Sequence, residues 1–296
     1  MSLSRYLRKK LHASLVKREE RTLLAQWFLL FGEHADPLNP PDPETLHRIV
    51  PPDDRFYADP FLVHDQGRHF IFFEEYPFAD PVGFISAVEV FADGAHGEVR
   101  PVIRTPYHLS YPVMFQRDGQ WFMMPESHQH NTIEIWTCEE FPWRWRLSHT
   151  LMEGVAAVDT TPLYHRGEWW LFTALRKNCK KFGDKLFLFR GDDLFGAHWE
   201  PHPLNPVRQG ILYDRPAGNI IVRDDRLYRP VQDSLTRYGG AMELREITVL
   251  SRDAYAEHCV RRMEPTPGSE LKGMHTYNAA HGWVVMDALR LVPRGA

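Results

Sequence analysis

The chain has 296 residues, of which 43% are hydrophobic, and a formal net charge of −4 at pH 7. This length suits one large domain or two modest ones, and the composition is that of an ordinary globular protein. The mild acidity argues against a nucleic-acid partner, and three widely spaced cysteines indicate neither a disulfide framework nor a zinc site but a reducing, cytoplasmic location.

Residues 1–24 are predicted to form a basic amphipathic helix. Seven Lys and Arg residues fall within the first 21 positions, and Leu7, Leu11 and Leu15 recur at helical spacing. Two interpretations fit this pattern: residues 1–22 rest on an anionic membrane surface, at the inner membrane, or a solvated helix packs on the domain. No apolar run of signal-peptide or transmembrane length follows.

Residues 25–52 are predicted to hold one strand and an extended linker. The strand is "AQWFLLFG" (Ala25–Gly32), and the Pro-rich stretch after about residue 34 lacks any periodicity. This linker is expected to lead into the main domain, residues 53–296.

A strand–turn–strand motif recurs through the main domain about every fifty residues. Its copies are "ADPFLVHDQGRHFIFFEE" (Ala58–Glu75), "SYPVMFQRDGQWFMMPES" (Ser110–Ser127), "VDTTPLYHRGEWWLFTAL" (Val158–Leu175), "RPAGNIIVRDDRLYRPVQDS" (Arg215–Ser234) and a weaker "MHTYNAAHGWVVMDALR" (Met274–Arg290). The expected turns contain Gly67, Gly119, Gly167, Asp225 and Gly282. A second marker, Trp four residues after Phe, occurs in "FPWRW" (Phe141–Trp145) and "FGAHW" (Phe195–Trp199).

Short strands around tight turns at this period are typical of a β-propeller with four-stranded blades. Alternating segments such as "GFISAVEVF" (Gly83–Phe91) and "TIEIWTCEE" (Thr132–Glu140) can supply a third strand. We therefore predict an all-β, five-bladed propeller whose blades begin near residues 55, 108, 157, 214 and 273. The strand Ala25–Gly32 is expected to complete the last blade and close the ring.

The predicted hairpins bring polar residues of every blade to one end of the central channel. The first strand of a blade lies nearest the axis, and an antiparallel hairpin returns the end of its second strand to the same place. The groups expected there are Asp59 with Glu74 and Glu75, then His108, Ser110 and Tyr111 with Glu126, then Asp159 with Thr173, then Arg215 and Asn219 with Gln232 and Asp233, and finally His275 and Asn278 with Asp287. Each residue alone can also serve as a cap or turn former. Packing does not require such carboxylates, because burial of unpaired charge is costly, so the set indicates an acidic functional pocket.

Asp59 and Asp159 are candidates for acid–base chemistry on sugars, which two carboxylates across a sugar-sized gap can perform. Their contexts resemble five-bladed glycosidases of the arabinanase and β-xylosidase type, which implies a base at Asp59 and a residue at Asp159 that tunes pKa and orients substrate. That family carries its acid, a Glu, at the fourth inner strand, where this chain reads "YDRPAGN" (Tyr213–Asn219). An acid beside Arg215 would have a lowered pKa and donate protons poorly, so Glu126 is the alternative donor.

Strings between about residues 50 and 290 resemble a second family. They are "DRFYADPF", "IFFEEY", "HLSYP", "MPES", "FPWRW", "VDTTPLYHRGEWWLF", "RPAGN", "YRPVQD", "YGGAMELREITVLSRDAYAE" and "GMHTYN". Together they resemble the N-terminal domain of the plant glucosamine inositolphosphorylceramide transferases and its bacterial stand-alone relatives. In the plant proteins a C-terminal glycosyltransferase domain follows, and it is missing here. The resemblance implies work on glycans or glycolipids, and for bacterial relatives a part in capsule or lipopolysaccharide assembly.

Three functions remain open. The preferred one is glycosyl transfer from a sugar, nucleotide-sugar or glycolipid substrate, and the alternatives are glycoside hydrolysis by Asp59, Asp159 and Glu126 or noncatalytic sugar binding as a scaffold for a separate glycosyltransferase. The expected substrate contacts are Glu75, His108, Tyr111, Arg215, Asn219, Arg229, Gln232, Asp233 and His275. Arg215 and Arg229 can clamp a phosphate or carboxylate. No cofactor is expected to be required, and the arabinanase resemblance allows a divalent cation in the channel, held with the help of His275.

Overall fold

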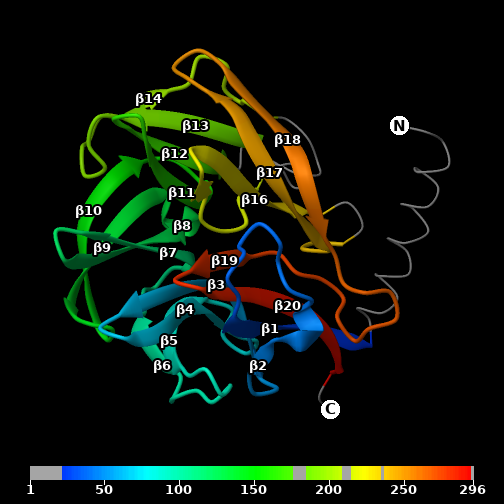
Figure 1. The fold of residues 1–296 in the computed structure, drawn as a ribbon. Coiled ribbons are helices and arrows are strands. Elements are labelled where there is room, and N and C mark those ends of the chain that lie inside the picture. The colour runs from blue at the N-terminus through cyan, green and yellow to red at the C-terminus, as the bar shows by residue number, and fades with distance from the viewer. Residues whose placement is uncertain (1–21, 176–184, 209–214, 235–236, 295–296) are drawn as a thin grey trace.

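The computed structural model describes residues 22–175, 185–208, 215–234 and 237–294. They form five four-stranded sheets arranged around a central axis (Figure 1). The predicted five-bladed propeller is therefore confirmed. The basic helix predicted over residues 1–24 lies almost entirely outside the described residues, and the described chain is already in strand β1 from Leu23 onward.

Four blades follow one another along the chain. Blade 1 consists of β3 (Arg55–Asp65), β4 (Arg68–Pro77), β5 (Phe84–Val90) and β6 (Arg100–Ile103), and blade 2 of β7 (Ser110–Arg117), β8 (Gln120–Ser127), β9 (Thr132–Glu140) and β10 (Arg144–Glu153). Blade 3 consists of β11 (Ala157–His165), β12 (Glu168–Leu175), β13 (Lys185–Gly191) and β14 (Glu200–Pro201), and blade 4 of β15 (Ile221–Arg223), β16 (Arg226–Asp233), β17 (Ala241–Leu250) and β18 (Tyr255–Met263). Strands neighbour each other in chain order, so each blade is an antiparallel meander.

Blade 5 is built from both ends of the described chain. It consists of β19 (Tyr277–Ala280), β20 (Trp283–Pro293), β1 (Leu23–Glu33) and β2 (His47–Ile49), in that order (blue and red strands in Figure 1). β1 pairs with β20 along its whole length, from Leu23 opposite Pro293 to Glu33 opposite Trp283. The predicted closure of the ring is confirmed, and β2 shows that the Pro-rich stretch also ends inside this blade.

The first hairpin of every blade turns on two residues in the left-handed region of backbone space. The pairs are Gln66–Gly67, Asp118–Gly119, Arg166–Gly167, Asp224–Asp225 and His281–Gly282, with φ between 47° and 85°. Two successive positive φ angles define the tight turn that matches the right-handed twist of a hairpin, and Gly, Asn and Asp are favoured there. This local chemistry explains why all five turns could be recognised in the sequence.

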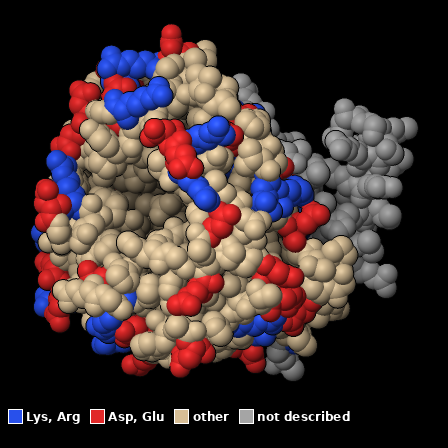
Figure 2. Space-filling view, in the orientation of Figure 1, with Lys and Arg blue, Asp and Glu red and all other residues tan. Residues whose placement is uncertain are grey.

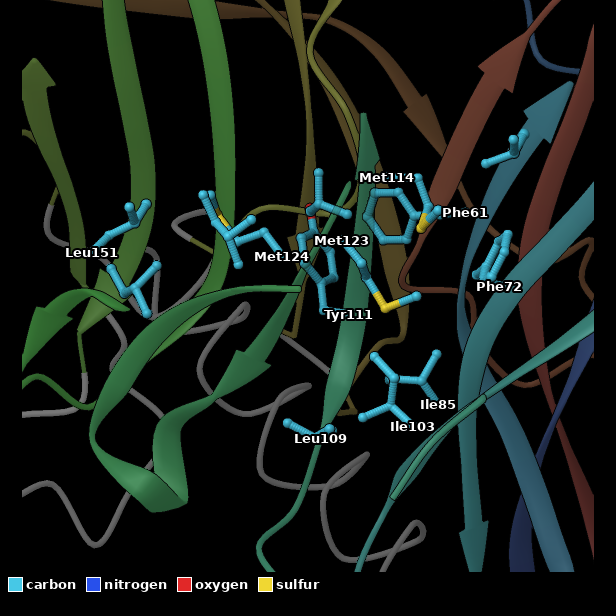
Figure 3. Packing of buried hydrophobic residues seen from close by; sticks show 14 of the residues in the cluster. Phe61, Phe72, Ile85, Ile103, Leu109, Tyr111, Met114, Met123, Met124 and Leu151 are labelled. Carbon is cyan, nitrogen blue, oxygen red and sulfur yellow. The ribbon is translucent and has the colours of Figure 1, made fainter. Parts of the chain in front are cut away.

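Large hydrophobic side chains fill the spaces between blades. Between blades 1 and 2, Phe61 and Phe72 belong to the same buried cluster as Met114 and Met123 (Figure 3). The Phe–Trp marker belongs to this packing, because Phe141 of blade 2 contacts Phe70 of blade 1, with ring centroids 5.2 Å apart. The second copy repeats the contact one blade later, with Phe195 of blade 3 against Phe122 of blade 2 at 4.8 Å.

The outer surface carries charges of both signs, interspersed over the face in view in Figure 2, which also shows that this face is hollowed. Helical structure in the described ranges is limited to three-residue turns, η1 (Pro43–Thr45) and η2 (His128–His130). No helix among these residues is long and apolar enough to cross a membrane.

Candidate active site in the central cavity

A cavity of about 420 Å³ opens where blades 1, 2, 4 and 5 meet. Its wall is made of Trp27, Phe56, Ala58, Asp59, Glu74, Tyr76, Pro81, His108, Ser110, Glu126, His128, Gln129, Arg215, Tyr238 and His275. The carboxylates lie deep in this wall, since Asp59, Glu74 and Glu126 are each at most 6% exposed. Aromatic rings beside buried acids are the surface that a sugar ring with its hydroxyl groups can fill.

A repeated break in the innermost strand positions the site. Asp59, Tyr111 and Asp159 occupy the same place in β3, β7 and β11, with φ of 52°, 44° and 52°. At each of them the pairing with the second strand shifts register. A residue with positive φ at a register shift is a β-bulge, which redirects a side chain, and non-glycine residues rarely adopt this conformation. The bulge in β3 therefore holds Asp59 at the cavity wall, and the bulge in β11 holds Asp159 just behind that wall.

Asp59 is anchored by blade 5. Its backbone N–H donates to Asp287 Oδ2 at 3.0 Å, and the Thr276 hydroxyl donates to Asp59 Oδ1 at 2.7 Å. Burial raises the pKa of the Asp59 carboxyl, and the negative charge of Asp287 adds to this effect while His275 opposes it. A carboxylate with a raised pKa is a better proton acceptor than an ordinary aspartate.

Asp159 forms a buried ion pair with Arg215. Arg215 donates from Nε to Asp159 Oδ2 at 2.6 Å and from Nη2 to Oδ1 at 3.0 Å, and Gln232 Nε2 donates to Oδ2 at 3.2 Å. Burial raises the pKa of Asp159, against the opposing effect of the guanidinium. Arg215 thus stands between Asp159 and the cavity.

Glu126 is held in its ionised form. It accepts the backbone N–H of Asp159 at 3.0 Å and pairs with His128 Nδ1 at 2.5 Å, and Arg215 Nη2 lies 3.9 Å away. Although burial opposes ionisation, these contacts bring the pKa of Glu126 far below its usual value. A carboxylate in this setting can stabilise positive charge but is a weak proton donor.

Glu74 and His108 form a second pair across blades 1 and 2. Glu74 Oε1 lies 3.2 Å from His108 Nε2, and the backbone N–H of Gly83 donates to His108 Nδ1 at 3.0 Å. Burial raises the pKa of Glu74 well above its usual value, and the neighbouring carboxylates, Asp59 first, add to the increase. Glu74 and Glu126 thus occupy equivalent strand positions in different protonation environments.

His275 packs between aromatic residues at the edge of blade 5. Its ring stacks on Trp27 with centroids 4.1 Å apart, and its Nδ1 lies 2.5 Å from Asp287 Oδ2. Burial lowers the pKa of His275, but the carboxylates of Asp287 and Asp59 outweigh this and raise it. Arg215 and Tyr238 complete this side of the cavity.

Asp59, His275 and Asp287 bring ligand atoms within 4.8 Å of one another, the arrangement in which a cation could be held. Both Asp287 oxygens already accept backbone N–H groups, from Asp59, His275 and Thr276. His275 Nδ1 is also engaged with Asp287, and Asp59 Oδ1 accepts the Thr276 hydroxyl. Of the ligand atoms in this described cluster, His275 Nε2 and Asp59 Oδ2 are left to bind a cation. Because a cation is usually held by more ligands than these two, the cluster is better described as a hydrogen-bonded network.

Several predicted substrate contacts lie away from the cavity. Glu75 forms an ion pair with Arg55 and accepts the Ser86 hydroxyl at 2.6 Å, because successive side chains of β4 point to opposite faces. Arg229 is fully buried and donates twice to Glu257, and Asp233 pairs with Arg262 at 2.5 Å.

Three other predicted contacts support the site from behind. The Tyr111 hydroxyl accepts the Gly218 N–H at 2.7 Å, and Gln232 holds Asp159 as described above. The Asn219 N–H donates to Asn278 Oδ1 at 2.7 Å, and Asn278 in turn donates to the Pro60 carbonyl. None of these three, nor Asp159, belongs to the described cavity wall.

Glu74 was predicted at the cavity end of its hairpin, but the expected substrate contacts included Glu75 instead, and they omitted Trp27, Tyr238 and His128. For Glu74 the signal was present, because the repeat aligns "FFEE" with "MPES" and thus Glu74 with Glu126. The structure has the same equivalence, with Glu74 opposite Ala58 and Glu126 opposite Ser110. Trp27 and Tyr238 lie outside the repeated hairpins, so the repeat gave no reason to choose them.

The five-bladed propeller fold of this chain is similar to that of solved glycoside hydrolases. Zg3597, a family 117 glycoside hydrolase of Zobellia galactanivorans, superposes with a TM-score of 0.56 at 12% identity, covering 90% of this chain and 91% of that one. A variant of the GH43 protein BlXynB from Bacillus licheniformis gives 0.52 at 14% identity, over 71% of this chain and 44% of that one. Likeness at such low identity concerns the fold alone.

The family is shown by sequence. Residues 48–292 match the model of "Glucosamine inositolphosphorylceramide transferase 1, N-terminal", and the chain belongs to this family. Glucosamine inositolphosphorylceramide transferase 1 of Arabidopsis thaliana is 30% identical over 207 residues, which are 68% of this chain and 27% of that protein. The protein of the same name from Oryza sativa subsp. indica is 29% identical over 255 residues, 81% of this chain and 34% of that protein. The chain thus spans about a third or less of the length of these relatives.

Proposed function

We propose that this protein takes part in glycan or glycolipid synthesis by transferring a glycosyl group in its central cavity. The observation that carries the proposal is a buried carboxylate, Asp59, in the wall of a sugar-sized acidic cavity, in a chain whose family is named for a glycosyltransferase. The substrate is a sugar carried by a lipid or nucleotide, and the scheme requires no cofactor.

In this scheme Asp59 is the general base. It takes the proton from a hydroxyl group of the acceptor while that oxygen bonds to the anomeric carbon of the donor sugar and the bond to the leaving group breaks. The raised pKa of Asp59 favours proton uptake, and its hydrogen bond from Thr276 fixes the carboxylate orientation. Glu126, held ionised, stabilises the positive charge that develops on the sugar ring.

Hydrolysis is the second candidate, and the fold favours it because the solved neighbours are glycoside hydrolases. Arg215 argues against hydrolysis. It is bound to Asp159, and it lies in the stretch in which arabinanase-type enzymes are expected to carry their acid. The same base can activate either water or an alcohol acceptor. Hydrolysis and glycosyl transfer therefore differ in which of these two acceptors the protein uses.

The test compares wild type with Asp59→Asn, a nearly isosteric change. Turnover is measured with candidate glycolipid donors and acceptors, and separately with aryl glycosides in water. We expect transfer to exceed hydrolysis in the wild type and Asp59→Asn to lower turnover by about a hundredfold or more. Glu153→Gln, on an exposed residue, is the matched control and should leave turnover unchanged.

The noncatalytic scaffold is a distinct outcome of the same experiment. It predicts sugar binding without turnover, and a loss of affinity in Asp59→Asn that corresponds to one charged hydrogen bond, roughly 1.5–3 kcal/mol. Unchanged turnover in Asp59→Asn, on a substrate that the wild type processes, would exclude this residue from the mechanism.

A further inference from the structure

The cavity lacks an evident proton donor where the sequence suggests one. A guanidinium remains charged at every accessible pH, so Arg215 cannot supply a proton. Glu126 is paired with His128 and lies close to Arg215, contacts that keep its carboxylate ionised. A leaving group that departs as an alcohol or alkoxide still needs a proton, and a different residue must provide it.

Glu74 has the geometry of a donor. It lies in the cavity wall, is 6% exposed, and its Oε1 is 3.2 Å from His108 Nε2. Its second oxygen, Oε2, has no hydrogen bond to the described residues, so this atom is free to face a ligand.

The backbone of Gly83 defines the tautomer of His108. Because the Gly83 N–H donates to Nδ1 at 3.0 Å, that nitrogen must carry a lone pair, and the ring proton resides on Nε2. The His108 Nε2–H therefore lies against Glu74 Oε1, 3.2 Å away, and a carboxylic proton on Glu74 is directed to Oε2.

Position 83 leaves little room for a side chain. A Cβ atom there would lie 2.6 Å from His108 Cε1 and 2.7 Å from Glu74 Oε1, far inside van der Waals contact. The Gly83 carbonyl also accepts the Leu109 N–H at 2.9 Å, which ties the His108 segment to the same loop. The three groups thus form one packed unit.

We propose that Glu74 is the proton donor of the reaction and that His108 is the residue that positions it. The inference rests on the proposed function and assigns a residue to it. As the bond between the anomeric carbon and the leaving oxygen breaks, that oxygen takes the proton from Glu74 Oε2. Asp59 receives the proton of the incoming hydroxyl, so the pair exchanges protonation states over one turnover and the net charge of the cavity is unchanged.

The surroundings of Glu74 agree with this role. Burial, and then the negative charges of Asp59, Glu126, Asp159 and Asp287, raise its pKa well above the usual value. The other titratable groups in the cavity wall are Tyr76, His108, His128, Arg215, Tyr238 and His275. His108 is neutral while its Nδ1 accepts a hydrogen bond, so it does not ionise Glu74 as a protonated imidazole would.

The experiment uses Glu74→Gln, which keeps the acceptor for His108 but has no proton to donate. Dinitrophenyl and phenyl glycosides of the same sugar are compared, because the first leaving group departs without protonation. We expect a loss of about a hundredfold or more on the phenyl glycoside, little loss on the dinitrophenyl glycoside, and loss of the basic limb of the pH–rate profile. Equal losses on both glycosides would overturn the proposal, since Glu74 would then act in binding.

A second measurement does not depend on turnover. The infrared carbonyl band of a protonated carboxylic acid, in the difference spectrum of wild type and Glu74→Gln, should be present at pH 7. An ionised Glu74 at this pH would overturn the assignment whatever the substrates show. A wild type that processes no glycoside would remove the proposed function alone, and the infrared result would still decide the protonation state of Glu74.

His108 is tested with a conservative variant. His108→Gln retains an amide N–H near the position of Nε2 and should keep the infrared band and most of the phenyl glycoside activity, whereas His108→Ala should shift both toward those of Glu74→Gln. Identical behaviour of the two His108 variants would overturn the positioning role.

Discussion

Arg229 has a structural role that differs from the ligand-binding role predicted from the sequence. In the sequence it is a candidate phosphate clamp within the fourth repeat, but it is fully buried in β16 and donates from Nε and Nη2 to Glu257 at 2.9 and 2.8 Å. Arg245 and the Tyr255 hydroxyl donate to the same carboxylate. Arg229 therefore holds blade 4 together and does not reach the central cavity.

The Glu257 network should make stability depend on acid. Burial opposes its ionisation, but Arg229 outweighs burial and lowers the pKa of Glu257 to about 2, from 4.5. Because the pKa is lower in the folded state, the stabilisation is complete above about pH 4.5 and is lost as the pH falls toward 2. We expect Glu257→Gln to cost roughly 3–5 kcal/mol at pH 7 and to flatten the pH dependence in this window.

Urea unfolding at several pH values measures both effects. Glu153→Gln, on the exposed surface, serves as the control and should follow the wild-type curve. A Glu257→Gln variant as stable as wild type at pH 7 would show that the buried network contributes little.

At the scale of elements, β1 is the strand on which the ring depends. It is the third strand of blade 5, it pairs with β20 over its full length, and Leu30 in it is completely buried opposite Met286. Although β1 and β20 are far apart in the sequence, β1 is thus as much a part of the core as the strands beside it.

We predict that Leu30→Ala and Met286→Ala destabilise the protein by similar amounts, roughly 2–5 kcal/mol each. The reason is that both side chains belong to one buried cluster formed by blades 4 and 5. Val50→Ala, on a side chain that is 45% exposed, should change the stability by less than about 0.5 kcal/mol. Denaturant unfolding followed by far-UV and near-UV signals is the measurement, and a separate early transition for Leu30→Ala would mean that β1 is not integrated in the cooperative unit.

At the scale of the molecule, the repeat made most of the fold predictable. Each hairpin is encoded locally, by strand alternation and by two turn residues such as Asp118 and Gly119 that accept positive φ. The choice between Glu74 and Glu75 required the alignment of Glu74 with Glu126, because it depends on which face of β4 meets the axis. Alternation specifies two faces but not which of them faces the cavity.

Contacts between distant parts of the chain could not be predicted in the same way. The partner of Arg229 lies in an outer strand, and the stacking of Trp27 on His275 joins the first strand to the last blade. Neither pair is marked by a motif, since only the three-dimensional closure of the sheets brings its members together.

Membrane contact is a prediction for the whole chain. If the basic segment binds an anionic surface, removing residues 1–22 should abolish binding to vesicles of acidic phospholipid and leave the propeller folded, because β1 begins at Leu23. Cosedimentation at low and high salt is the measurement, and salt should weaken binding through charge screening. Intact protein that fails to bind such vesicles at low salt would contradict the prediction.

The joining of both chain ends in blade 5 also bears on how the protein is made. During synthesis β1 leaves the ribosome first, but its partner β20 follows some 250 residues later, which corresponds to roughly 10–50 s of translation. Throughout this interval the apolar strand "LLAQWFLLFGE" can pair with the three-residue strand β2, but its long edge toward β20 stays unpaired. We therefore expect newly made chains to need a chaperone at this segment, and the cavity to form only after the last blade has been synthesised.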